Sequence, residues 1–120
     1  MAAPNIVNVS AIYGKTVGAA VTTSLTSVLT NSSGSNKVFK VNSIIAANID
    51  GTNSADLSVT VYKNATTDYY LASTISVPAD STLVVASKDT PFYLEENDSI
   101  RALANANGDI HIIISYEELA

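Results

Sequence analysis

Short runs of alternating apolar and polar residues recur along this chain and constrain its fold more than any other feature. Every second residue is apolar in the run 57–63 (LSVTVYK), and the run 109–117 (DIHIIISYE) places three isoleucines on one face. A period of two is the side-chain period of a β-strand. Turn-forming clusters such as Asp50-Gly51 separate the runs, and no helical crossover lies between them. The sequence therefore predicts an all-β fold, an antiparallel β-sandwich or jelly-roll-like fold with eight or nine short strands. It leaves the strand order open between a jelly-roll and an immunoglobulin-like topology.

The β-rich runs between turn clusters give the expected strand positions. They are residues 6–13, 20–30, 37–49, 57–63, 69–77, 82–87, 92–94, 99–104 and 109–117. We expect Gly14 and Gly18 to break the chain after the first strand. Within 20–30, the expected buried residues are Val21, Leu25 and Val28.

Two of these runs support more detailed expectations. Strict alternation along 37–49 puts Phe39, Val41, Ile45, Ala47 and Ile49 on one face, with Val38, Lys40, Asn42 and Ile44 on the other. Asn107-Gly108 is a strong turn signal for a β-hairpin. It predicts that the strands 99–104 and 109–117 pair with each other.

The length and charge of the chain narrow the possible classes of protein. The 120 residues suit a single domain, expected to span 1–120 with a short N-terminal arm of about residues 1–5. The net charge is −5 and the six basic residues are scattered, which argues against nucleic-acid binding. No apolar run approaches the roughly 20 residues of a membrane span, and the N-terminus has no secretory pattern, so synthesis in a cytoplasm is expected.

The chain contains no cysteine, which excludes disulfides and zinc–thiolate sites. A small domain without such cross-links takes its stability from its core or from neighbouring molecules, so a homo-oligomer is expected. Charged residues make up only 14% of the chain, and Ser, Thr, Asn and Ala replace them. Small polar groups cost less to desolvate than charges, which suits protein–protein contacts.

No pattern in the sequence predicts a catalytic, cofactor or metal site. His111 is the only histidine and has no nucleophile motif to serve. The acidic turn at 95–98 and the segment 50–56 (DGTNSAD) have oxygen ligands for a hard cation, but both are better read as solvated turns. Tyr69-Tyr70 near a loop tip could contact a sugar or a protein partner, with one ring expected in the core and one on the surface.

Seven segments give the chain an overall likeness to a known group of proteins. They are MAAPNIVNV (1–9), IYGKT (12–16), KVFKVNS (37–43), NIDGTN (48–53), ISVPADSTL (75–83), YLEENDSI (93–100) and SYEE (115–118). In these segments the sequence resembles small virion structural proteins of marine tailed phages, especially cyanophages. The likeness covers nearly the full chain, but it contains no matched functional motif, so no residue role is carried over.

The resemblance implies a non-enzymatic capsid decoration (cement) protein on the capsid surface of the virion, made in the host cytoplasm. Its implied partner is the major capsid protein or another virion protein, and its implied oligomeric state is a homotrimer. The N-terminal arm is short and mildly apolar and could add a strand to a neighbour's sheet. Together with the two tyrosines, this makes the expected partner contacts Ala3, Pro4, Asn5, Ile6, Tyr69 and Tyr70.

Three other functions remain open at the level of sequence. One is a tail, neck or baseplate component, which is also structural. Another is a host-binding module for cell-surface glycans, with Tyr69 or Tyr70 as the first residues to test. The last is an enzyme, which the absence of a credible catalytic constellation disfavours.

Overall fold

The computed structural model describes residues 7–120, and within that range every regular element is a β-strand. The strands are β1 Ile12–Ala20, β2 Thr26–Thr30, β3 Val38–Asn48, β4 Ala55–Lys63, β5 Thr67–Val77, β6 Thr82–Ala86, β7 Phe92–Leu94, β8 Ser99–Ala104 and β9 Ile110–Leu119. The all-β prediction is confirmed, with nine strands in the described residues.

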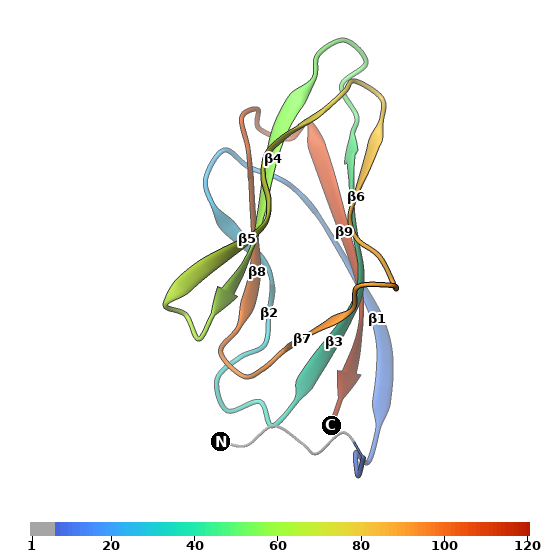
Figure 1. The fold of residues 1–120 in the computed structure, drawn as a ribbon, viewed down its shortest axis with the longest axis vertical. Helices are drawn as coiled ribbons and strands as arrows, with labels where there is room; N and C mark the ends of the chain where they lie inside the picture. Colours follow the sequence, from blue (N-terminus) through green and yellow to red (C-terminus); the bar gives the residue numbers. More distant parts are fainter. Residues whose placement is uncertain (1–6) are drawn as a thin grey trace.

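The strands form two antiparallel sheets that pack face to face (Figure 1). Sheet A has the order β1-β9-β3-β6, with the short β7 also paired to β3. Sheet B has the order β2-β8-β4-β5. The chain changes sheet at almost every connection, which interleaves the two layers in the manner of a jelly roll. The predicted antiparallel β-sandwich is therefore the observed architecture.

Alternation builds the core between the two sheets. Ile110, Ile112 and Ile114 of β9 are fully buried, as the sequence predicts. They face Leu57 and Val59 of sheet B, which are also fully buried. Because no disulfide is present, the association of the sheets depends on this apolar contact.

The prediction for the N-terminal third of the chain is wrong in its boundaries. The first strand begins at Ile12, and Gly14 and Gly18 lie inside it instead of ending it. A full ladder of bonds to β9 outweighs the low strand preference of glycine here. Of the expected core residues that follow, Val21 is buried, whereas Leu25 and Val28 are only partly buried.

The predicted faces of 37–49 are wrong beyond Val41 because β3 contains a bulge. The register with β9 shifts between Val41 and Ser43, which inserts one extra residue. An extra residue exchanges the two faces of the strand beyond it. Phe39 and Val41 are buried as expected, but after the bulge Ile44 is buried and Ile45 is exposed.

The predicted hairpin between the last two strands is also wrong. β8 pairs with β2 and β4 in sheet B, while β9 pairs with β1 and β3 in sheet A. The Asn107-Gly108 segment turns the chain as expected, and Gly108 has a positive φ of 82°. The turn carries the chain from one sheet to the other, because the apolar faces of both strands must meet across the core.

The two faces of β9 allow a direct test of this core. Replacing Ile112 by alanine leaves a cavity between the sheets and should lower the free energy of unfolding by about 2–5 kcal/mol. The matched control is Ile113→Ala on the same strand, where the exposed side chain predicts a change within roughly 0.5 kcal/mol. Chemical denaturation measures both, and equal effects would contradict the assigned faces.

Candidate functional site

The outer face of sheet A carries three exposed apolar side chains in one line. Ile113 of β9 pairs with Ile45 of β3, and Ile45 pairs with Val84 of β6. Their exposed fractions are 46%, 36% and 59%, so all three side chains are in contact with solvent. Single exposed apolar residues are common, but three on adjacent strands form a continuous patch of the kind that marks interaction sites. We call Ile113, Ile45 and Val84 the apolar row.

Mostly small residues lie beside the apolar row on this face. Gly18 of β1 continues the row past Ile113. Two residues away on each strand, a second row of paired neighbours faces the same way. It consists, in the same strand order, of Ala20, His111, Ala47 and Thr82. Small side chains such as glycine and alanine allow a second protein surface to approach the sheet closely.

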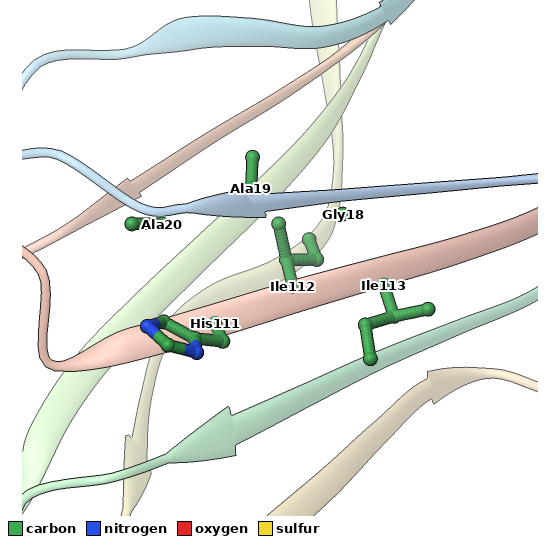
Figure 2. Close-up of a pocket in the computed structure, with 6 residues that line it drawn as sticks. All are labelled: Gly18, Ala19, Ala20, His111, Ile112 and Ile113. Atoms are coloured by element: carbon green, nitrogen blue, oxygen red, sulfur yellow. The ribbon is translucent and has the colours of Figure 1, made fainter.

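A shallow, mainly apolar hollow of about 360 Å³ lies where β1 meets β9 (Figure 2). Gly18, Ala19 and Ala20 contribute from β1, and His111, Ile112 and Ile113 from β9 (Figure 2). The imidazole of His111 is exposed, and no residue of 7–120 bonds to it. A lone exposed imidazole with neither carboxylate nor nucleophile beside it is not a general-base arrangement.

The expectation that one of Tyr69 and Tyr70 lies in the core is wrong. Their exposed fractions are 62% and 55%. They lie on β5, an edge strand of sheet B, where the register with β4 shifts twice. Near its tip the β4–β5 hairpin projects beyond the sandwich, so neither face of β5 is covered there (Figure 1).

The other predicted contacts, Ala3, Pro4, Asn5 and Ile6, lie outside the described residues. The structure thus brings the two tyrosines together on one exposed strand but does not place them beside the apolar row. They belong to sheet B, whereas the row belongs to sheet A.

The acidic turn after β7 is not the solvated turn that the sequence predicts, because Asp98 is buried. Its carboxylate accepts hydrogen bonds from the backbone of Asn64 at 2.8 Å and of Glu95 at 2.9 Å. The Lys63 ammonium lies 2.6 Å from Asp98 and 2.7 Å from Glu95. Hydrogen bonds to these two carboxylates raise the pKa of Lys63. The ammonium therefore occupies the position that a bound cation would take.

The segment 50–56 uses its first carboxylate to hold a turn. Asp50 accepts hydrogen bonds from the backbone N–H groups of Thr52 at 2.8 Å and Asn53 at 3.2 Å. These bonds lower the pKa of Asp50. Within the part of the chain that the structure describes, no group of three or more His, Asp or Glu side chains could hold a metal ion. In that same part, no helix is long and apolar enough to cross a membrane.

A second buried carboxylate, at the end of sheet A opposite the apolar row, joins β9 to β1 and to the residue just before β3. Glu118 of β9 accepts hydrogen bonds from Lys15 at 3.0 Å and from Lys37 at 3.1 Å. Burial alone would raise the pKa of Glu118, but the two lysines outweigh burial and hold that pKa below its ordinary value of 4.5. An ion pair of this kind fastens strands and leaves no free acid for chemistry.

Sequence reasoning identified part of the apolar row and missed the rest. Three consecutive isoleucines at 112–114 require one of them to face away from the core, and the alternation assigns that place to Ile113. The alternation places Ile45 on the same face as Phe39 and Val41, which is wrong because the bulge in β3 has no signature in the sequence. Val84 had no distinguishing signal, since 82–87 is apolar at consecutive positions.

Comparisons with known proteins give a distant structural likeness. No family model matches the chain, and no curated protein matches it. Two similar solved structures are crystal structures of a pentameric capsid protein isolated from metagenomic phage sequences, one of them solved by iodide SAD phasing. Each is 18% identical to this chain with a TM-score of 0.39. The match covers 87% of this chain but only 60% and 62% of those chains, so this chain spans less than two thirds of their length. A likeness this distant carries no functional argument.

The Glu118 ion pairs predict a specific pH dependence of stability. Because the pKa of Glu118 is lower in the folded than in the unfolded chain, its contribution is present above pH 4.5 and is lost as the pH falls through the folded-state pKa. We expect Glu118→Gln to flatten the decline of the unfolding free energy below pH 4.5. Denaturant titrations at a series of pH values measure this, and an unchanged slope would refute the contribution.

Proposed function

We propose that this chain is a non-enzymatic structural protein of a phage particle, and specifically a capsid decoration protein that binds the mature head lattice. The observation that carries the proposal is the apolar row, which lines up Ile113, Ile45 and Val84 on a rigid sheet with no partner among residues 7–120. The sequence resemblance to phage virion proteins supplies the kind of partner, a major capsid protein.

The geometry of sheet A suits docking better than chemistry. Each side chain of the apolar row is held by a strand bonded within the sheet, so little conformational entropy is lost when the row is covered. Covering it removes apolar surface from water, which is favourable without any need for specific polar pairing. The surrounding alanine, glycine and threonine side chains add small surfaces that are inexpensive to desolvate.

Three acidic side chains support a structural role because ion pairs and hydrogen bonds occupy them. Asp98 and Glu118 are buried against lysines, and Asp68 forms a two-point contact with Arg101 at 3.1 and 2.6 Å. Arg101 also lies over the ring of Tyr62 at 4.0 Å from its centroid. Paired carboxylates of this kind stabilise the sandwich and are poorly suited to act as catalytic acids or bases.

A decoration protein bound only to the mature lattice would stabilise that lattice by mass action. In this proposal the chain acts on the capsid surface, as a homo-oligomer for which the resemblance implies a trimer. Electron microscopy of particles that carry labelled protein distinguishes this site from a tail, neck or baseplate position.

Binding to undecorated phage heads tests the proposal directly. We expect the purified protein to sediment with the heads, and we expect Ile113→Asp to weaken binding at least tenfold, or ~1.4 kcal/mol, because a charge would be buried in the contact. The matched control is Ile75→Asp on β5 of the opposite sheet, where the side chain is exposed to 41%. The control should bind like the unmodified protein.

Circular dichroism and thermal unfolding establish that both variants are folded before binding is measured. Failure of the unmodified folded protein to sediment with heads would refute the decoration role. Equal binding by the two variants would refute the apolar row as the contact.

A second candidate function, glycan binding, is favoured by the exposure of both Tyr69 and Tyr70. Exposed aromatic rings can stack on sugars, and β5 presents these two close to the tip of a projecting hairpin. A glycan screen with the unmodified protein and with Tyr69→Ala and Tyr70→Ala decides this point. Binding that depends on a tyrosine, without binding to heads, would favour host recognition over decoration.

A further inference from the structure

The sandwich has four sheet edges, and they differ in how well they are protected. The edge strands are β1 on one side of sheet A, β6 and the three-residue β7 on its other side, and β2 and β5 in sheet B. The register is irregular along β2, along β5 and between β3 and β6. Among the described edge strands longer than three residues, β1 alone keeps an unbroken register, with nine consecutive pairs to β9. Bulges are a common means of preventing edge strands from pairing with other chains, and β1 lacks one.

The hydrogen bonds at both ends of β1 identify the backbone groups that face its free edge. Ala11 and Ala120 exchange bonds of 3.1 and 3.0 Å, and the N–H of Val21 donates to Ile110 at 2.8 Å. In a regular antiparallel ladder, bonded pairs alternate with non-bonded pairs. The odd-numbered residues therefore bond to β9, and the even-numbered ones direct their N–H and C=O groups away from it. The latter are Ile12, Gly14, Thr16, Gly18 and Ala20, all exposed.

Two of these five residues are glycines that the isolated molecule does not require. Neither Gly14 nor Gly18 has a positive φ. A Cβ atom at Gly14 would meet nothing within 4 Å, and one at Gly18 would make ordinary contacts at 3.8 and 3.9 Å. Glycine inside a strand often marks a place where another backbone approaches closely.

We propose that β1 pairs with β1 of a second copy of this chain, antiparallel, about a two-fold axis at Thr16. This register opposes Ile12 to Ala20 and Gly14 to Gly18 of the second copy, and it uses all five free-edge residues. Sheet A then continues from one molecule into the next. The backbone bonds of this pairing follow the strand-addition mode of recognition.

Charge distinguishes this register from its neighbours. The chain has a net charge of −5, yet β1 contains no acidic residue, so two acidic copies can approach along this edge. The one charge on β1, Lys15, is paired with Glu118 and would lie opposite Val17 of the second copy. Moving the two-fold axis from Thr16 to Lys15 would place Lys15 opposite Lys15 of the second copy, which is unfavourable. Moving the axis to Val17 would leave Ile12 unpaired, because its partner would lie beyond the end of β1.

The proposal concerns the isolated protein and does not depend on capsid binding. Its two-fold symmetry gives a dimer instead of the trimer that the resemblance implies. Sedimentation equilibrium or light scattering on the purified protein, at physiological ionic strength to screen the net charges, should show a dimer. A trimer, or a monomer at every concentration studied, would overturn the proposal.

Two double variants test the register itself. Within one molecule, residues 14 and 18 are about 13 Å apart along the strand, but between copies they are directly opposed. We expect Gly14→Lys with Gly18→Lys to weaken dimerisation at least tenfold, and Gly14→Lys with Gly18→Glu to retain the dimer. Equal dimerisation by the two folded variants would overturn this register.

If the double variant Gly14→Lys with Gly18→Lys does not fold, a third variant tests whether β1 is the contact between copies. Thr16→Pro removes an N–H that faces the free edge, without removing a bond to β9, and proline is tolerated at such edge positions. The folded Thr16→Pro protein should be monomeric. A dimer of unchanged affinity would show that β1 is not the contact.

Discussion

The packing of β9 against the opposite sheet is the interaction on which the rest of this structure depends. β9 is bonded to β1 on one side and to β3 on the other, and its inward isoleucines are fully buried. Successive side chains of a strand point to opposite faces of the sheet. Because Ile112 and Ile114 face the core, Ile113 must face solvent. The apolar row therefore begins as a consequence of the core. A substitution that reversed the face of β9 would remove core and row together.

Polar side chains at the ends of the strands fix the crossings between the two sheets. Asn31 is fully buried at the end of β2, and its amide donates to the carbonyls of Lys37 at 2.8 Å and Leu94 at 3.0 Å. Asn48 does the same at the end of β3, donating to Asn53 at 3.0 Å and Val77 at 2.9 Å. Each amide satisfies backbone carbonyls that the strands leave unpaired, so burial of the loops costs little. Chain crossings in a jelly-roll-like fold need such bonds, because every change of sheet interrupts a ladder.

The sequence was informative where a side chain's position depends on its neighbours along the chain. The alternation around Ile112 and the short run at β7 predicted strands correctly because period two is a local property. It failed where pairing between distant segments decides the outcome. The bulge that turns Ile45 outward exists only in the register between β3 and β9. The exposure of Tyr70 depends on where sheet A ends, which the residues beside it cannot encode.

A jelly-roll-like order does not specify a function, because unrelated activities use the same scaffold. What distinguishes this molecule is the placement of two unpartnered features on one sheet. The free edge of β1 lies one strand from Ile113, because β1 is bonded directly to β9, the strand that carries Ile113. Pairing two copies through β1 would therefore set two apolar rows on one continuous sheet. Two rigidly linked contacts bind a repeating surface with much higher avidity than either contact alone. In the proposed decoration role, a weak apolar row would then suffice, because binding sites on a capsid lattice recur at fixed spacing.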